Sequence, residues 1–273
     1  MPDSHAAFVG SIPENYDRYL GPVLFEPHAA DLVARLDLPD NGVVLELACG
    51  TGIVTRRLRE RLARTSKIIA TDLNDAMLAY AMRKFDASAA IEWNRADATE
   101  LPFSDQSFDA VVCQFGIMFF PDKEKAVHEV FRVLKPGGVF LFNVWDKIEQ
   151  NDLPRVAHIV ISKFFDDNPP NFYEIPFSFH DPSVIRSLLS TAGFRQIHSE
   201  SVSLPAIAHS ARDLAHGLVH GNPVIAAIRE RDESRIPEIE ATVEATVIRE
   251  YGDAPVRARM QALVCSALSS KGC

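Results

Sequence analysis

Two hydrophobic periods alternate along residues 43–145, the most regular part of the chain. Short apolar runs typical of buried strands are VVLELA (43–48), KIIATDL (67–73), AIEWNRAD (90–97), FDAVVCQFG (108–116) and GVFLFNVW (138–145). Segments that repeat apolar residues at helical spacing are 53–66, 74–85 and 123–134. Strands that alternate with helices predict a parallel sheet covered by helices on both faces. We therefore expect a doubly wound α/β fold.

The rest of the chain is less regular. Residues 194–204 and 256–268 are strand candidates, which brings the expected sheet to seven mostly parallel strands. Helical patterns fill most of residues 147–180 and 205–255, and we expect these to be lid insertions over the carboxyl ends of the strands. The expected organisation is an N-terminal helical cap (1–40), a ligand-binding core (41–146) and, in the same domain, the remaining strands with their lid insertions (147–273).

Composition narrows the class of protein. The chain has 273 residues, of which 47% are hydrophobic, so it can form a substantial core. The longest apolar stretch, 110–120, is interrupted by Gln114 and is too short to span a bilayer. The first residues lack the order of a signal peptide. These features favour a cytoplasmic protein without membrane insertion.

Charge and cysteine spacing argue against two further classes of partner. The net charge is −9 and no block of Lys and Arg is present, which speaks against a nucleic-acid partner. The four cysteines, of which the last is Cys273, show no CxxC or zinc-type spacing, so neither a disulfide scaffold nor a structural metal is expected.

A glycine-rich turn follows the first expected strand. Gly50 and Gly52 allow the backbone to approach a ligand closely, and the helix that follows offers free N–H groups. Asp72 lies at the end of the second strand, 22 residues after Gly50, where a carboxylate can accept both ribose hydroxyls. This combination predicts a nucleoside-binding site.

The same turn indicates which nucleoside is bound. A dinucleotide site has a third small residue where this chain has Thr55. Glu46, just before the turn, would repel a pyrophosphate but suits a cationic amino group. Both features favour a ligand with an amino acid tail. An NAD(P)-dependent oxidoreductase remains an alternative, although the chain also lacks a Tyr-x-x-x-Lys pair after the fourth strand.

Four ordered motifs over residues 43–145 carry a family resemblance. They are ELACGTG (46–52), DLN (72–74) with Met77, RADA (95–98) followed by LPF (101–103), and LKPGG (134–138). With these motifs the chain resembles the class I S-adenosylmethionine-dependent methyltransferases, in the small-molecule subgroup of "methyltransferase type 11" enzymes related to UbiE. The resemblance implies a Rossmann-like sheet and methyl transfer from S-adenosylmethionine, which becomes S-adenosylhomocysteine, to an O, N, C or S atom of a small, apolar or aromatic molecule.

The resemblance also implies a set of cofactor-binding residues. They are Tyr16, Glu46, Ala48, Gly50, Gly52, Asp72, Leu73, Met77, Asp97, Ala98, Gln114 and Phe115. In the family Asp97 would meet the adenine amino group, and Gln114 and Phe115 would lie beside the sulfonium. Tyr16 and Tyr19 fall where related enzymes fold a helix over the cofactor. The segment 142–145 departs from the acidic residue and serine that quinone methylases carry near the end of strand five.

Several readings stay open. No catalytic residue can be identified, and a cofactor-binding module without catalysis remains an alternative, as does a homodimer. Asn168-Pro169-Pro170 lies in a later loop than the similar tripeptide of amino-methylating DNA enzymes, so a proline-stiffened turn is favoured. His216 and His220 have helical spacing but lack the glutamate of a zinc-helix motif, so no metal site is expected.

Overall fold

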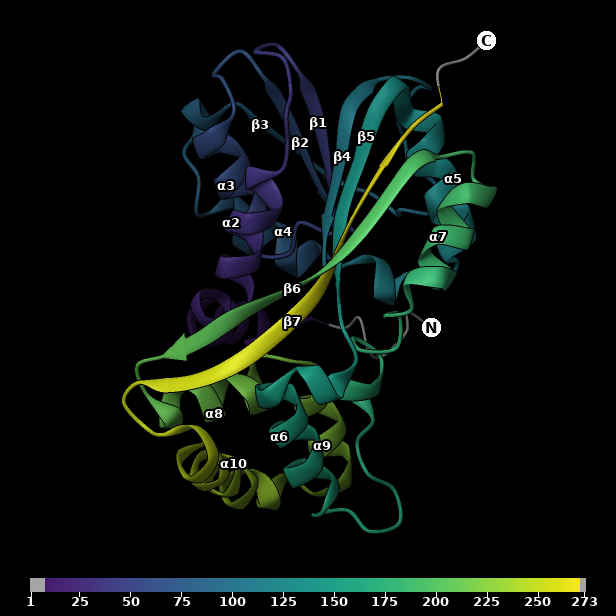
Figure 1. The fold of residues 1–273 in the computed structure, drawn as a ribbon. Coiled ribbons are helices and arrows are strands. Elements are labelled where there is room, and N and C mark those ends of the chain that lie inside the picture. The colour runs from purple at the N-terminus through teal and green to yellow at the C-terminus, as the bar shows by residue number, and fades with distance from the viewer. Residues whose placement is uncertain (1–7, 271–273) are drawn as a thin grey trace.

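The computed structural model describes residues 8–270 and contains one seven-stranded sheet (Figure 1). The strands are β1 (Val43–Leu47), β2 (Lys67–Asp72), β3 (Ile91–Arg95), β4 (Phe108–Gln114), β5 (Leu134–Trp145), β6 (Arg195–Ala208) and β7 (Val256–Leu268). Their order is β3-β2-β1-β4-β5-β7-β6, with β7 antiparallel to both of its neighbours and β1–β5 paired in parallel. The expected seven-stranded, mostly parallel sheet is confirmed.

Helices cover both faces of the sheet. The longer ones are η2 (Tyr16–Phe25), α2 (Glu26–Ala34), α3 (Ile53–Arg61), α4 (Asp75–Met82), α5 (Lys123–Val133), α6 (Asp152–Ser162), α7 (Pro182–Thr191), α8 (Ala211–His220), α9 (Val224–Asp232) and α10 (Ile236–Tyr251). Single turns are α1 (Ile12–Asn15), η3 (Ala87–Ala89), η4 (Ile117–Phe119), η5 (Ile148–Gln150), η6 (Phe172–Glu174) and η7 (Glu233–Arg235). In Figure 1, α2, α3 and α4 lie on one side of the sheet, and α5 and α7 lie on the other.

A second helical layer lies beyond the carboxyl ends of β1–β5. The strands β6 and β7 are long and twist away from the other five, and α6, α8, α9 and α10 pack around their far ends (Figure 1). Helix α8 contacts both α10 and the π-helical segment η2. The helical layer is thereby joined to the N-terminal segment that borders the switch point between β1 and β4, where open α/β sheets bind ligands.

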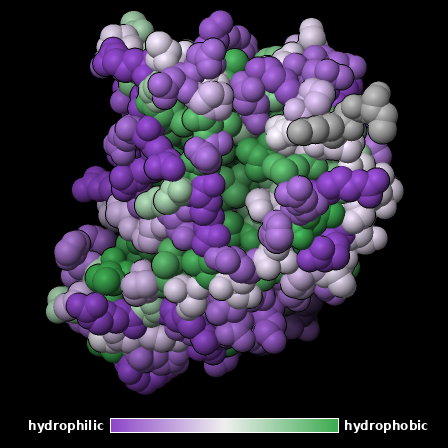
Figure 2. Space-filling model, turned by 45° about the horizontal axis from the view of Figure 1, so that its top comes forward, coloured by the Kyte–Doolittle hydropathy of each residue, from purple (hydrophilic) through white to green (hydrophobic). Residues whose placement is uncertain are grey.

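Apolar side chains from both layers form one continuous core. The same cluster of buried residues runs from Ile12 to Ala267 and includes the strand interiors and the inner faces of α8 and α10. Figure 2 shows one face of the molecule, on which apolar residues are visible across the middle and polar residues surround them. Within residues 8–270, no helix is long and apolar enough to cross a membrane.

The start of β5 differs from the sequence-based expectation. The strand expected over 138–145 begins earlier, at Leu134, so that LKPGG (134–138) belongs to β5 and α5 ends at Val133. The reason is pairing with neighbouring segments: Leu134 pairs with Phe108, and the N–H of Gly137 donates to the carbonyl of Ser269.

Candidate active site

The glycine turn and the end of β2 are hydrogen-bonded to each other. The N–H of Gly50 donates to Oδ2 of Asp72 over 2.8 Å, and the N–H of Asn74 donates to Oδ1 over 2.8 Å. Ala48, Gly50 and Gly52 all have positive φ angles, and a Cβ built on Gly50 would meet no atom within 4 Å. The turn therefore leaves open space above its backbone, where a ligand can approach closely.

Asp72 keeps hydrogen-bonding capacity for a ligand. Each carboxylate oxygen can accept two hydrogen bonds, and the N–H groups of Gly50, Asn74 and Leu73 use only part of this capacity. Burial raises the pKa of Asp72, while the N–H groups of Asn74 and Gly50 act in the opposite direction. The carboxylate is thus held rigidly at the edge of the turn, with lone pairs left for the vicinal hydroxyls of a ribose.

Glu46 is a buried carboxylate at the carboxyl end of β1. It is 1% exposed, and its Oε2 accepts a hydrogen bond of 2.6 Å from the Thr55 hydroxyl. Burial raises its pKa to about 8, the hydrogen bond from Thr55 lowers it, and the negative charge of Asp72 raises it further. A cationic ligand would offset the free-energy cost of ionising this buried carboxyl, whereas a pyrophosphate would increase that cost.

A small cleft opens beside Glu46, and Asp72 is joined to its edge through Gly50 without lining it. Its lining residues are Tyr16, Phe25, Glu46, Ala48, Cys49, Gly50, Thr51, Ile53, Val54 and Gln114. The Thr51 hydroxyl is buried and has no hydrogen-bond partner among residues 8–270. A buried hydroxyl without a partner is costly, so this cleft is suited to a polar ligand that supplies one.

Gln114, the last residue of β4, lines the cleft and precedes a tight turn. Gln114 donates from Nε2 to the carbonyl of Phe25 over 3.3 Å, and its Oε1 accepts from Asn143 over 3.4 Å. Phe115 has a φ of 50°, a conformation that a bulky residue adopts only when its surroundings impose it. A Cβ on Gly116 would lie 2.6 Å from the Cβ of Ala48, so glycine is required where this turn meets the glycine turn.

Aromatic rings form the wall behind the cleft. Tyr16 stacks on Phe25 with 4.4 Å between ring centroids, and Phe115 stacks on Trp145 with 3.7 Å between centroids. Phe25 approaches both Phe115 and Trp145 at 6.0 Å. Burial raises the pKa of Tyr16 well above its usual range, with Asp17 and Asp72 adding to the effect. Its phenol is thus a hydrogen-bond donor and not a base.

The residues expected on the adenine side lie outside this cleft. Leu73 is 50% exposed, and Asp97 is exposed with its Oδ1 accepting two hydrogen bonds from Thr99. Ala98 and Met77 are buried. Phe115 also does not line the cleft, because its ring packs on Trp145. Tyr19, expected over the cofactor, instead contacts the ring of His216 at 5.0 Å.

Some cleft residues were not expected from the sequence. They are Phe25, Cys49, Thr51, Ile53 and Val54. Cys49 and Thr51 lie inside the glycine motif, and Ile53 and Val54 begin the helix after it, so their nearness along the chain was a usable signal. Phe25 reaches the cleft from a segment about 20 residues earlier, and only packing brings it there.

His28 is a second residue that the sequence did not single out. It is 1% exposed and packs edge-on against Phe115 and Trp145, with 5.5 and 5.1 Å between centroids. Neither ring nitrogen has a hydrogen-bond partner within the described part of the chain. Burial lowers the pKa of His28 to about 4, although Asp31 acts in the opposite direction. The imidazole is therefore neutral at pH 7.

We expect His28→Phe to stabilise the protein and to flatten its response to acid. Because the pKa of His28 is lower in the folded than in the unfolded chain, stability is lost as pH falls from about 6.5 to 4, by about 3 kcal/mol in total. Phenylalanine cannot charge, and it removes two unpaired nitrogens, which is worth about 1 kcal/mol at pH 7. Urea unfolding at pH 7.5 and 4.5 measures both effects. His198→Gln, an exposed position, serves as the control. If His28→Phe were less stable than the wild type at pH 7.5, the expectation that the His28 ring nitrogens lack hydrogen-bond partners would be contradicted.

Comparison with known proteins gives consistent matches over this region. A family model described as "Methyltransferase domain" matches residues 45–142. The 2-phytyl-1,4-naphtoquinone methyltransferase of Thermosynechococcus vestitus is 30% identical over 176 residues, covering 59% of this chain and 76% of that protein. The ubiquinone/menaquinone biosynthesis C-methyltransferase UbiE of Salmonella paratyphi B is 29% identical over 181 residues, covering 60% of this chain and 71% of the relative.

Solved structures share the fold at low sequence identity. The YcgJ protein of Bacillus subtilis has a TM-score of 0.59 at 19% identity and covers 90% of this chain and all of its own. The phosphoethanolamine N-methyltransferase 2 of Haemonchus contortus, solved with S-adenosylhomocysteine, has a TM-score of 0.59 at 16% identity, covering 94% of this chain and 57% of that one. The [4+2]-cyclase SpnF also scores 0.59, at 20% identity, with 90% and 81% coverage.

Proposed function

This chain belongs to the class I S-adenosylmethionine-dependent methyltransferases of the UbiE-like type, and from that premise we propose that it methylates a small, apolar or aromatic molecule. The cofactor is S-adenosylmethionine. We also propose roles for individual residues of the cleft. The observation that carries the proposal is the buried carboxylate of Glu46 in a cleft that Tyr16 and Phe25 also line, with Asp72 hydrogen-bonded to the glycine turn at its edge.

The residues at the cleft fit this cofactor. In our proposal Glu46 binds the amino group of the methionine part, and Thr51 supplies a hydroxyl that otherwise lacks a partner among the described residues. Asp72 binds the ribose hydroxyls with its remaining lone pairs. Leu73, half exposed beyond Asp72, covers one face of the adenine. A dinucleotide fits less well, because Glu46 lies where a pyrophosphate would have to pass.

When bound, the cofactor supplies a methyl group that is already activated by its sulfonium. The protein's own contribution is then to align the acceptor and to exclude water. Alignment of two reactants in a site can lower a barrier by about 7–11 kcal/mol. Gln114 serves as a positioning residue here, since it ties the end of β4 to the carbonyl of Phe25 and so fixes the two sides of the cleft relative to each other.

The aromatic wall supports an apolar or aromatic acceptor. Tyr16 and Phe25 line the cleft, and the Phe115–Trp145 pair lies directly behind Phe25. Flat rings stack favourably on such side chains, and displacing water from them adds to affinity. One relative is named as a 2-phytyl-1,4-naphtoquinone methyltransferase and another for ubiquinone and menaquinone biosynthesis. Apolar ring compounds are accordingly the first acceptors to test.

Calorimetric titration with S-adenosylhomocysteine tests the cofactor site, with NAD and NADP as controls. We expect one micromolar site per chain for S-adenosylhomocysteine and no binding of either dinucleotide. Transfer of a labelled methyl group from S-adenosylmethionine to a panel of phenols, quinols, aromatic amines and aromatic thiols then tests the acceptor class. Tight cofactor binding together with transfer to polar aliphatic acceptors alone would overturn the acceptor proposal and leave the family assignment intact.

A further inference from the structure

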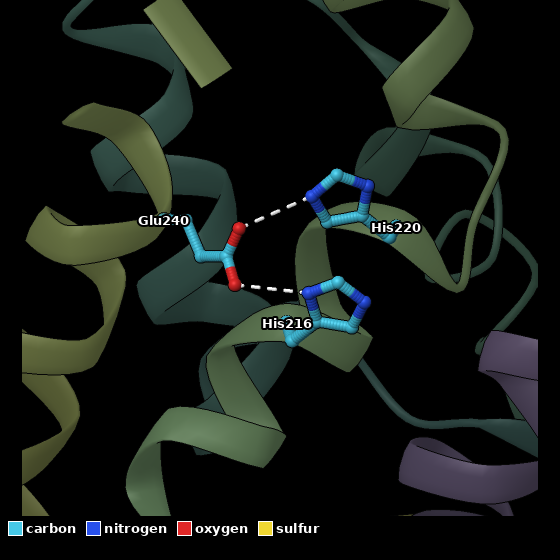
Figure 3. A group of neighbouring side chains, drawn as sticks. All are labelled: His216, His220 and Glu240. Atoms are coloured by element: carbon cyan, nitrogen blue, oxygen red, sulfur yellow. Dashed lines mark hydrogen bonds and ion pairs between the residues drawn. The ribbon is translucent and has the colours of Figure 1, made fainter. Parts of the chain in front are cut away.

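Two histidines and one glutamate meet where α8 packs on α10 (Figure 3). His216 and His220 are four residues apart on α8, so they lie on the same face of the helix, and their rings stack with 4.4 Å between centroids. Glu240 comes from α10 and lies opposite both rings. Its Oε1 is 2.9 Å from Nδ1 of His216, and its Oε2 is 3.2 Å from Nε2 of His220.

From the sequence no metal site was expected here, because the segment with His216 and His220 lacks the glutamate of a zinc-helix motif. The glutamate is present, but it comes from another helix 20 residues after His220. The three side chains are the donor set that zinc and similar divalent ions prefer, namely imidazole nitrogen and carboxylate oxygen. Two histidines and one carboxylate leave a fourth tetrahedral position for water.

The three ligand atoms must move closer together to hold an ion. Ligand atoms around a tetrahedral zinc lie about 3.4 Å apart, given metal–ligand distances of about 2.0–2.2 Å. The candidate ligand atoms of His216, His220 and Glu240 all lie within 4.8 Å of one another. Each side chain is partly exposed, at 34%, 18% and 26% respectively, so an ion can enter and exchange water. Small side-chain adjustments would complete the site.

We propose that His216, His220 and Glu240 bind one divalent transition-metal ion, of the zinc class, which fastens α8 to α10. The site lies next to the N-terminal segment: the ring of Tyr19 contacts His216, and a Cβ on Gly217 would lie 2.7 Å from the Cβ of Tyr19. Tyr19 belongs to η2, the segment that also carries Tyr16 of the cleft. A bound ion therefore stabilises the helical layer beside the cofactor cleft.

The test uses the full chain, stripped with a chelator and titrated with zinc chloride in the absence of cofactor. We expect one ion per chain, a melting temperature raised by about 5 °C or more at saturating zinc, and a tetrahedral visible spectrum with cobalt(II). His216→Ala and Glu240→Gln should each weaken zinc binding by at least about 100-fold and remove the thermal shift. His209→Ala, an exposed histidine just before α8, should leave both unchanged.

Two outcomes would overturn the proposal: no zinc-dependent shift in the wild-type chain, or a shift that persists in the His216→Ala, Glu240→Gln double variant. Circular dichroism of each metal-free variant guards against loss of the fold, and Glu240→Gln retains the shape of the side chain it replaces. Because zinc binding is measured without S-adenosylmethionine or acceptor, a failure to bind zinc says nothing about methyl transfer. A failure of methyl transfer likewise says nothing about zinc binding.

Discussion

Asp72→Ala is expected to lower the affinity for S-adenosylhomocysteine by at least about 100-fold, equivalent to about 3 kcal/mol. The substitution removes the hydrogen bonds from the ribose hydroxyls to the carboxylate, each of which is strengthened by the negative charge. It also removes the acceptor of the N–H groups of Gly50 and Asn74, which the carboxylate holds at 2.8 Å. Without these hydrogen bonds the glycine turn would lose more conformational entropy when the cofactor binds. Calorimetric titration measures the change directly.

A matched control separates these effects from loss of a carboxylate in general. Asp181 also accepts a backbone N–H, from Ser183 over 2.7 Å, but it caps the exposed start of α7. Asp181→Ala should lower stability through loss of the N-cap and leave cofactor affinity unchanged. If Asp72→Ala bound S-adenosylhomocysteine as well as the wild type does, the ribose assignment would be wrong.

Affinity for S-adenosylhomocysteine should rise steeply between pH 6 and pH 8. In the free protein burial raises the pKa of Glu46 to about 8, so below that pH the carboxyl is mostly protonated. Binding the cationic amino group requires the carboxylate. Each unit of pH below 8 is therefore expected to cost up to about tenfold in affinity, and binding should release a proton to the buffer.

Glu46→Gln removes the titrating group and keeps the shape. We expect its affinity to be nearly independent of pH between 6 and 8, and at pH 8 to be about 10–100-fold weaker than that of the wild type. Glu92→Gln, at an exposed position on β3, should retain the wild-type profile. A wild-type affinity that does not change with pH would contradict the placement of the amino group at Glu46.

The fold and the cofactor turn could be predicted because their signals are local. Strands buried between two layers of helices are near-continuous apolar runs, and AVVC (110–113) meets that requirement. The glycine turn needs positive φ angles, which glycine adopts readily, so Gly50 and Gly52 mark it directly. Asp72 was predictable for the same reason, since it ends a strand at a known spacing from the turn.

The remaining features depend on contacts between distant segments. Phe25 and His28 reach the Phe115–Trp145 pair from the other side of the sheet's switch point, although nothing in their local pattern distinguishes them from ordinary helix residues. Asp97 shows the opposite case. Its motif could be recognised in the sequence, but in the structure its side chain is exposed and accepts hydrogen bonds from Thr99.

By itself, the sequence determined the seven-stranded sheet and the glycine turn, because each follows from local backbone requirements or from the period of apolar residues. The choice of S-adenosylmethionine followed from the resemblance of four ordered motifs to those of a known family. Only the tertiary structure decided which rings line the cleft and which carboxylate faces His216 and His220. Glu240 is separated from them by a helix and a turn, so its position is determined by how α8 packs on α10. Packing of this kind depends on the shapes of many side chains at once, and no spacing along the chain records it.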